Sequence, residues 1–490
     1  MNSQEQDMKT KPYDHQAACL KAMKDRTRFA IFMEQGLGKS KVILDEANEA
    51  FEDGRINGLL VIAPNGVHSN WALREAPKHL DMYKCFVIEY RGKWAKSKRH
   101  RNNLNAALSH KGLSIFVINV EALSTKTAAV AQAEEFLRGR QCIMVIDESS
   151  RIKNPSSRRT KTILKLGALA KYKRILTGTP VTQSPFDLYA QFRFLDPAIL
   201  GFTSFHSFKH QYGKFETEYA NRNGRIWKYE ILESYRRLDQ LKHAISLHSF
   251  RALKQDCLDL PDKIYKTYSF QMSEEQSKLY RDMSEEGVLE FDDFELLAPQ
   301  QIVRLLRLQQ ITGGFVPIGN DDEHPGTIIP GPNPKLSFLI DSLKDDYPGK
   351  SIVWARFRFE IAMIVRTLKE EFGDDVVVEL HGGVTGTDRI RAVDRFQTDD
   401  TCRFVVGQQA SGIGIDLYAA ENVFYYSNPF SYEQRVQSED RCHRIGLRHP
   451  VSYVDLVIEG TIDEKVVQVL MKAGRLADET MGDKRRRKDD

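Results

Sequence analysis

Short runs of apolar residues recur through the first part of the chain and are separated by stretches with helical spacing. The runs lie at 29–33, 59–63, 86–88, 115–118, 142–146 and 174–176. Such runs are typical of strands that are buried in a parallel sheet. Their alternation with helical segments predicts an α/β lobe.

A second set of apolar runs repeats this pattern near the other end of the chain. These runs lie at 352–355, 376–380, 404–406, 423–426 and 451–456. A chain of 490 residues is also too long for one ordinary core. We therefore predict an α/β fold with two parallel-sheet lobes in tandem.

The sequence between the two lobes differs from both. From about residue 202 to 260 it is rich in aromatic and charged residues with helical spacing, Pro261 marks a break, and 314–334 has the Gly, Pro and Asp content of an exposed loop. The predicted organisation is an N-terminal lobe over 1–260 with a helical insertion at about 200–260, a linker and helical protrusion over 261–333, a C-terminal lobe over 334–470, and a basic tail over 471–490.

Composition narrows the kinds of site and compartment to expect. The six cysteines are scattered without a Cys-x-x-Cys pair, so they suggest neither a zinc site nor a disulfide framework. No apolar stretch reaches membrane-spanning length and the polar start lacks a secretion pattern, so we expect a cytoplasmic protein, or one in the host cytoplasm if it is phage-encoded. For the basic run 484–488, a solvated tail is favoured over a phosphate-binding segment.

A phosphate-binding loop is the first candidate for chemistry. The residues Glu34-Gln35-Gly36-Leu37-Gly38-Lys39-Ser40 follow an apolar strand and precede a helix, a context in which backbone N–H groups can surround phosphate oxygens. Lys39 would reach the β- and γ-phosphates and Ser40 would ligate Mg²⁺. Met33 stands where the usual pattern has Gly, so the loop alone fits a simple helix start equally well.

Two adjacent carboxylates end a predicted strand. Asp147 and Glu148 follow the run 143–146, at the sheet edge where open α/β sheets bind ligands. One carboxylate can hold Mg²⁺ while its neighbour orients the attacking water, and we assign these roles to Asp147 and Glu148 respectively. A helix cap is the alternative for this pair.

The segment Thr177-Gly178-Thr179-Pro180 follows another strand and brings two hydroxyls to the same edge. It is suited to sensing the γ-phosphate, although in isolation a plain Gly-Pro turn is the favoured interpretation. In the second lobe, Arg441 and Arg444 are predicted on one face of a helix over 432–445. They could enter the nucleotide cleft as arginine fingers, or be surface ion-pairing residues.

These motifs, in this order, resemble the Swi/Snf-type DNA translocases of helicase superfamily two. The similarity runs from about residue 11 to 470, and its most specific stretches are Arg151-Ile152-Lys153-Asn154 and His443-Arg444-Ile445-Gly446. It implies two RecA-like lobes, ATP and Mg²⁺ as cofactors, and an adenine-reading Gln16. The implied ATP-binding residues are Gln16, Gln35, Gly36, Leu37, Gly38, Lys39, Ser40, Gly414 and Asp416. The implied residues that couple ATP to nucleic acid are Asn70, Trp71, Lys153, Thr177, Thr179, Gly382, Ser411, Gly412 and Gln437.

Several positions depart from the family pattern. Ser149-Ser150 replace the usual small residue and His after the carboxylates, and Gln409, Asp416 and Leu447 stand where Arg, Asn and Gln are frequent. None of these changes removes a phosphate or metal contact. An active ATPase is therefore expected, with coupling that differs from the family norm.

The resemblance implies a motor that tracks double-stranded DNA through phosphate contacts, and the chain has little room for regulatory domains. The expected function is remodelling of branched DNA by fork regression, branch migration or annealing, with protein partners unknown and no membrane. The alternatives are a helicase that separates strands of DNA or RNA, a motor subunit of a nuclease or restriction-modification complex, and a clamp that binds ATP without turnover. The basic run 91–101, which contains Trp94, is either a nucleic-acid contact or a solvated loop.

Overall fold

The computed structural model describes residues 9–124, 128–222, 225–284, 299–317, 326–384, 386–412 and 415–484. The chain forms two compact units. Unit 1 comprises Met1–Cys257 with Arg475–Asp490, and unit 2 comprises Leu258–Gly474. The lobe boundaries given above, including the tail, stay a prediction, and residues 485–490 of that tail lie outside the described part.

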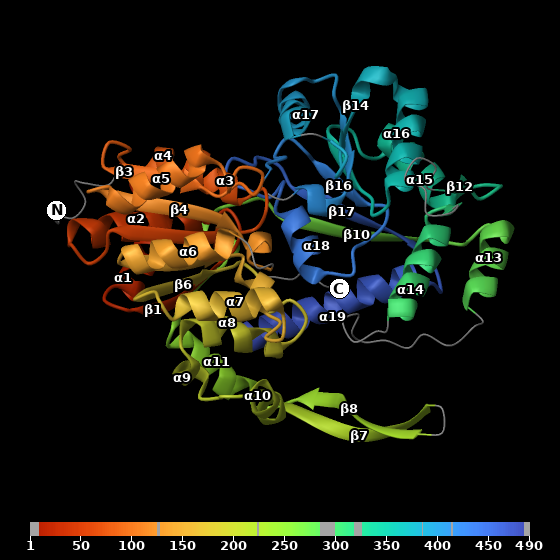
Figure 1. The fold of residues 1–490 in the computed structure, drawn as a ribbon. Coiled ribbons are helices and arrows are strands. Elements are labelled where there is room, and N and C mark those ends of the chain that lie inside the picture. The colour runs from red at the N-terminus through yellow and green to blue at the C-terminus, as the bar shows by residue number, and fades with distance from the viewer. Residues whose placement is uncertain are drawn as a thin grey trace. The chain divides into compact units, whose positions relative to one another are not determined.

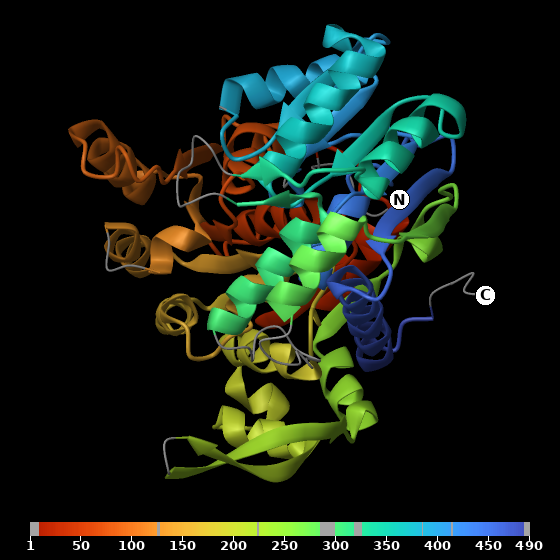
Figure 2. The ribbon, with the colours of Figure 1, turned by 90° about the vertical axis from the view of Figure 1, so that its right-hand side faces the viewer.

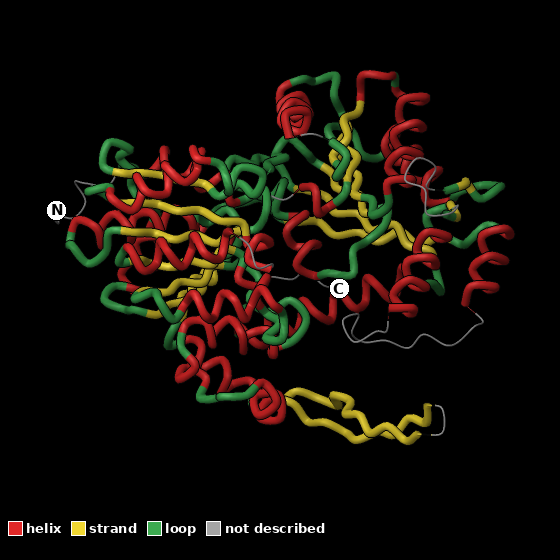
Figure 3. The backbone as a smooth tube through the Cα atoms, viewed as in Figure 1, coloured by secondary structure: helices red, strands yellow, loops and turns green. Residues whose placement is uncertain are grey.

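Unit 1 is built on a parallel seven-stranded sheet with helices packed around it (Figures 1 and 3). Its strand order is β3-β4-β2-β5-β6-β1-β9. The strands are β1 Arg28–Met33, β2 Gly58–Ala63, β3 Cys85–Glu89, β4 Leu113–Asn119, β5 Cys142–Asp147, β6 Tyr172–Leu176 and β9 Ser249–Ala252. The main helices are α1 Asp14–Met23, α2 Lys39–Glu52, α3 His68–Asn70, α4 Ala76–His79, α5 Lys98–Ser109, α6 Ala128–Gly139, α7 Arg158–Gly167 and α8 Leu188–Leu195. The strands predicted here are confirmed, and β2 and β5 are buried along their whole length.

The insertion of unit 1 is only partly helical, so the helical prediction is wrong for 213–235. Helices α9 Pro197–Leu200 and α10 Phe205–Tyr212 lead into an antiparallel hairpin, and α11 Leu238–Ser246 follows it. The hairpin strands are β7 Gly213–Arg222 and β8 Arg225–Tyr235. Figure 2 shows the hairpin extending from the end of α10. Its residues alternate between charged and apolar types, and this period of two favours strand over helix.

Unit 2 contains a parallel six-stranded sheet of order β10-β17-β16-β13-β15-β14. Its strands are β10 Lys263–Phe270, β13 Ser351–Trp354, β14 Val377–Leu380, β15 Phe404–Gly407, β16 Asn422–Tyr425 and β17 Val451–Ile458, and a separate small ribbon pairs β11 Phe315–Val316 with β12 Thr327–Ile328. The helices are α13 Glu274–Ser284, α14 Pro299–Thr312, α15 Pro334–Asp345, α16 Arg358–Phe372, α17 Gly386–Thr398, α18 Tyr432–Glu439 and α19 Ile462–Met481, whose residues from Arg475 onward belong to unit 1. Helix α12 Lys254–Cys257 ends the first segment of unit 1. All the predicted strands are present, and β10 is an additional strand that lies within the predicted linker.

Two apolar clusters of unit 2 pack on its sheet. One contains side chains of α15 and α16, including Leu339 and Ile364, and the other contains Phe396 of α17. The α/β prediction with two parallel sheets is therefore confirmed. In the described part of the chain, no helix combines the length and apolar character needed to cross a membrane.

Candidate active site

The loop between β1 and α2 in unit 1 has the backbone shape of a phosphate cradle. Gly36 and Gly38 both have positive φ, at 85° and 80°, and Gly38 is the N-cap residue that precedes α2. Glycine adopts this region without the strain that a side chain would add. The turn leads the chain directly into the N-terminus of α2, where free backbone N–H groups favour an anion.

Gln16 of α1 holds this loop from the side. Its side-chain amide donates to the carbonyl of Leu37 at 3.0 Å and accepts from the backbone N–H of Tyr13 at 3.0 Å. A Cβ added at Gly38 would lie 2.2 Å from the Gln16 amide nitrogen. The Gln16 side chain can therefore occupy this place because residue 38 is glycine. Beside them, the rings of Tyr13 and His15 stack with centroids 5.9 Å apart. Tyr13 is 56% exposed and therefore offers an aromatic face next to the loop.

Lys39 and Ser40 form the first turn of α2. The Lys39 side chain is buried and its ammonium donates to the carbonyl of Met33 at 3.0 Å. This places the charge back over the loop instead of out along the helix. Ser40 is half-buried in the same turn.

The two carboxylates differ sharply in their surroundings. Asp147 is buried at the end of β5, where it accepts from the indole N–H of Trp71 at 2.8 Å and from the backbone N–H of Glu148 at 3.0 Å. The pKa of Asp147 is raised to about 6. Burial is the largest cause and the negative charge of Glu148 also raises it, whereas the hydrogen bond from Trp71 and the charge of Lys39 lower it. The charge of Lys39, at the end of the phosphate loop, therefore acts on Asp147.

Glu148 is directed into the same site by an uncommon backbone conformation. Its φ of 50° lies in the left-handed region, which costs a non-glycine residue about 1 kcal/mol or more. One carboxylate oxygen accepts from the Gln35 amide at 3.4 Å and the other from the Thr177 hydroxyl at 3.3 Å. Glu148 is thus linked to the phosphate loop on one side and to the end of β6 on the other.

Replacing the buried carboxylate of Asp147 is expected to change how the free energy of unfolding depends on pH. Because the pKa of Asp147 is raised in the folded state, the folded protein binds more protons than the unfolded chain between about pH 4 and 6, and stability falls as pH rises through this range. Asp147→Asn removes this cost. Its stability relative to the wild type should rise by about 1–2 kcal/mol between pH 5 and pH 8, measured by thermal unfolding without nucleotide or Mg²⁺. The exposed Asp239→Asn is the control, and a pH-independent difference for Asp147→Asn would contradict the raised pKa.

The segment after β6 is connected to the loop through Arg251 of β9. The Arg251 guanidinium donates to the carbonyls of Phe32 and Gly178, both at 3.0 Å, and pairs with Asp483 at 2.6 Å. A Cβ at Gly178 would lie 3.3 Å from the backbone nitrogen of Gln35, so the two segments approach closely. Arg251 was not among the predicted site residues. Its contacts are to backbone carbonyls far away in sequence, which no local motif reveals.

The residues after Glu148 turn away from the carboxylates toward α8 and the β6 loop. Ser149 donates to Gln191 at 2.7 Å, and Lys153 donates to Thr182 and Gln183 at 3.0 and 2.7 Å. The Ser149 side chain is fully buried. The departure from the family pattern at this position is therefore accommodated by a hydrogen bond within the unit.

The two arginines of unit 2 do not share a helix face, so that prediction is wrong. Helix α18 ends at Glu439, and the chain continues in tight turns. The backbone N–H of Cys442 donates to the carbonyl of Glu439, that of Leu447 donates to the carbonyl of Arg444, and Gly446 within the second turn has a φ of 99°. Arg441 is buried and donates to the carbonyl of Ile415 at 3.2 Å. Arg444 forms an ion pair with Asp416 and retains 26% side-chain exposure.

A buried ionic network fixes the end of α18 in unit 2. Arg435 pairs with Asp455 of β17 and with Glu439 at 2.9 Å, and lies 3.5 Å over the ring of Tyr425. Lys263 of β10 reaches Glu439 at 3.1 Å. This network positions the start of the arginine segment against the sheet.

Breaking this network is expected to destabilise the protein strongly. Asp455→Ala leaves the buried Arg435 without its main partner, which should cost about 3–5 kcal/mol of unfolding free energy. The measurement is chemical denaturation. Glu370→Ala, which removes an exposed pair with Arg366, is the control and should change stability little. A loss as small as the control's would contradict the network's role.

Two family models match separate parts of the chain. An SNF2-related domain matches residues 13–311, and a helicase conserved C-terminal domain matches 334–446. The chain belongs to the SNF2-related family. The resemblance inferred from the motifs is thus confirmed.

Curated relatives of this SNF2-related chain come from eukaryotes and bacteria. It is 26% identical to the chromatin structure-remodeling complex subunit snf21 of Schizosaccharomyces pombe, over 89% of this chain and 36% of that protein. It is 25% identical to the putative ATP-dependent helicase/translocase YwqA of Bacillus subtilis, over 91% of this chain and 46% of that protein. The chain spans less than half the length of either relative. The solved Sulfolobus solfataricus SWI2/SNF2 ATPase core in complex with dsDNA is 22% identical, covers 98% of this chain and 95% of that chain, and gives a TM-score of 0.43.

The remaining residues proposed from the SNF2-related pattern differ in surroundings. Trp71 is 1% exposed, so its side chain meets Asp147 and not the surface. Asn70 is half-buried, Gln437 is buried and donates to Glu433 at 3.2 Å, and a Cβ at Gly382 would meet open space. Gly414 lies outside the described residues, and the side chain of Ser411 is not described. The coupling roles of these residues, and that of Gly412, stay predictions.

Proposed function

We propose that this protein is an ATP-hydrolysing motor that moves along double-stranded DNA and remodels branched DNA in the cytoplasm. One observation carries the proposal. In unit 1, Glu148 is hydrogen-bonded both to Gln35 of the phosphate loop and to Thr177 after β6. A carboxylate that can orient water is thus linked to a phosphate-binding loop and to a segment that can sense the γ-phosphate, which are groups that phosphoryl transfer needs. The arrangement occurs in a chain of the SNF2-related family.

The residues of unit 1 suit ATP and Mg²⁺. The positive φ values of Gly36 and Gly38 shape the turn that leads into the N-terminus of α2, where backbone N–H groups can bind phosphate oxygens. Ser40 and the buried Asp147 supply the hydroxyl and carboxylate oxygens that Mg²⁺ prefers. When bound, Mg²⁺ neutralises charge on the phosphates. Gln16 and the exposed ring of Tyr13 flank the loop, and we assign recognition of the base to them.

The chain's own residues have distinct tasks in this proposal. Lys39 brings a positive charge to the terminal phosphates from the first turn of α2. Asp147 holds the metal while Trp71 fixes the carboxylate orientation. Glu148 accepts a hydrogen bond at its carboxylate from the attacking water and orients it. Thr177 reports the state of the γ-phosphate to the segment after β6. Arg441 and Arg444 are proposed to complete the site from unit 2.

Duplex DNA is the proposed track. The name of the bacterial relative includes translocase, and that of the yeast relative refers to remodelling of chromatin. Contacts to phosphates would be independent of sequence and sensitive to salt. The proposed coupling residues are Asn70, Trp71, Lys153, Thr177, Thr179, Gly382, Ser411, Gly412 and Gln437.

The hairpin β7–β8 favours strand separation as a second candidate function. A helicase that unwinds a duplex needs a pin between the strands, and the extended hairpin that follows α10 has the form of such an element. Its exposed side chains include Tyr219 at 68% and Tyr229 at 43%, aromatic rings that are able to stack on bases. A motor subunit of a nuclease complex is a further outcome that the same experiment addresses.

The test is ATP hydrolysis with no nucleic acid, single-stranded DNA, duplex DNA, forked DNA and RNA, followed by triplex displacement, fork regression and duplex unwinding. Stimulation by duplex DNA, triplex displacement and fork regression without unwinding of a plain duplex is the expected result. Lys39→Ala serves as the inactive control.

Other results of these assays would favour one of the alternative functions. Unwinding of a plain duplex that is lost when Tyr219 and Tyr229 are replaced by Ala would favour the helicase. Stimulation by RNA alone would overturn the DNA substrate. Translocation without any effect on forks would remove the branched-DNA role and favour a motor subunit.

A further inference from the structure

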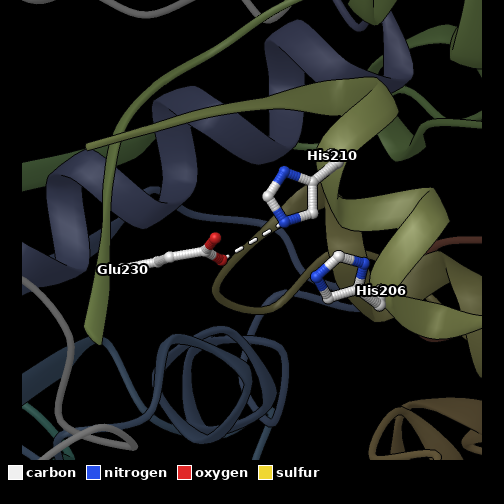
Figure 4. A group of neighbouring side chains, drawn as sticks. All are labelled: His206, His210 and Glu230. Carbon is white, nitrogen blue, oxygen red and sulfur yellow. Dashed lines mark ion pairs between the residues drawn. The ribbon is translucent and has the colours of Figure 1, made fainter. Parts of the chain in front are cut away.

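Three metal-ligating side chains meet at the base of the hairpin in unit 1. His206 and His210 are four residues apart on α10 and therefore project from one face of the helix. Glu230 lies opposite them on β8 (Figure 4). None of the three belongs to the candidate active site or to the SNF2-related motifs.

The three side chains are already close to the spacing that one metal ion requires. Each offers a ligand atom, and these atoms lie within 4.8 Å of one another. The Nε2 atom of His210 is 3.2 Å from a Glu230 oxygen, and the centroids of the two imidazole rings are 4.2 Å apart. Tetrahedral Zn²⁺, with bonds of about 2.0–2.2 Å, holds its ligand atoms about 3.3–3.5 Å apart. Small side-chain rotations are enough to reach that spacing.

We propose that His206, His210 and Glu230 bind one divalent transition metal of the Zn²⁺ type and that the bound metal fastens β8 to α10. Two imidazoles and one carboxylate are a ligand set found in zinc sites that keep a fourth position for water. Imidazole nitrogen favours Zn²⁺, Co²⁺ or Ni²⁺ over Mg²⁺, which prefers oxygen ligands. The side chains of His210 and Glu230 are 36% and 43% exposed, so metal and water have access from solvent.

Helix α10, which carries both histidines, is firmly supported. The opposite face of α10 is buried through Phe208 and Tyr212, whose rings pack 5.0 Å apart in an aromatic cluster that includes Phe186. The ring of His210 also contacts Phe215 of β7 at 4.8 Å. The helix therefore presents both histidines from a fixed base.

Nearby cations are directed to other partners. Lys209 lies over the ring of Phe215 at 4.9 Å. Arg236 donates to the backbone carbonyl of His210, and Arg237 donates to Gln211 at 2.8 Å. Each cation has a contact that does not involve the ligand atoms. The inference concerns the hairpin and does not depend on the motor activity.

Metal titration of the complete, EDTA-treated chain without nucleotide tests the site. Co²⁺ should bind with a ratio of one per chain and give the intense visible absorption of a tetrahedral complex, which Zn²⁺ should abolish and Mg²⁺ should not. His206→Ala, His210→Ala and Glu230→Gln should each weaken binding at least about tenfold. His243→Ala, at an exposed histidine on the neighbouring α11, is the matched control and should bind like the wild type.

A second measurement, backbone hydrogen exchange, tests whether the bound metal fastens β8 to α10. Zn²⁺ should slow backbone hydrogen exchange in β7 and β8 of the wild type but not of His206→Ala. Thermal unfolding of each metal-free variant should match the metal-free wild type, which shows that the variants are folded. Absence of stoichiometric binding, or binding unaffected by all three substitutions, would overturn the site. Binding without slower exchange would overturn the fastening of β8.

Discussion

Lys39→Ala is expected to lower ATP turnover by about 10²–10³-fold. Lys39 is the first residue of α2, and its ammonium is held over the phosphate loop by the carbonyl of Met33. Its charge also reaches Asp147, whose pKa it lowers. Removing it takes away a positive group aimed at the place where negative charge develops. The measurement is steady-state ATP hydrolysis with saturating duplex DNA.

DNA affinity measured without nucleotide should be largely unchanged in this variant, because Lys39 is buried in the loop and does not offer its charge to the surface. Lys21→Ala, at an exposed lysine of α1, is the control for loss of a charge nearby. Turnover equal to the wild type would show that the loop does not hold the phosphates. Loss of DNA binding in a folded variant would contradict the separation between the nucleotide site and the DNA track.

The central strands were predictable because their burial leaves a direct mark on the sequence. A strand such as β2, with every residue buried, must be a continuous apolar run. Strand β10 carries no such mark. It lies at the edge of its sheet, most of its residues are exposed, and lysine and tyrosine alternate along it. Strand β9 has only four residues, too few to show a period.

The hairpin had a local signal that helical spacing of its aromatic residues obscured. Asn223-Gly224 stands between two alternating segments in the sequence, and this dipeptide is a frequent connection between hairpin strands. Charged and apolar residues alternate on both sides of it. The period of two therefore outweighs the aromatic spacing that favoured a helix.

The sequence predicts which residues belong to the candidate site, but it does not predict which of them contact one another. The motif identified Trp71 but could not show that its indole would donate to Asp147, 76 residues away. Arg251 of β9 and Asp483 after α19 are 232 residues apart, and only the fold of unit 1 brings them together. Similarly, the end of α18 depends on Lys263 from β10, a strand that was not predicted. Long-range ionic contacts leave no periodic trace in the sequence.

Arg441 and Arg444 of unit 2 differ in burial and in hydrogen-bond partners. Arg441 is buried and bonded to Ile415, so replacing it would disturb the fold as well as any catalytic role. Arg444 is partly exposed and is held by Asp416 and by the carbonyl of Asp440 at 3.1 Å. Its charge is therefore held in a defined place while part of the side chain remains accessible. Arg444 is the better position at which to test a finger.

Arg444→Ala is expected to lower ATP turnover by about 10³–10⁵-fold while ATP binding is retained, as for loss of an arginine finger. The measurements are DNA-stimulated hydrolysis and equilibrium binding of a fluorescent ATP analogue. Arg448→Ala, four residues further on and exposed, is the matched control and should keep wild-type turnover. Undiminished hydrolysis by Arg444→Ala would exclude the finger role and leave catalysis to unit 1. Loss of ATP binding together with turnover would assign Arg444 to holding the nucleotide instead of stabilising the transition state.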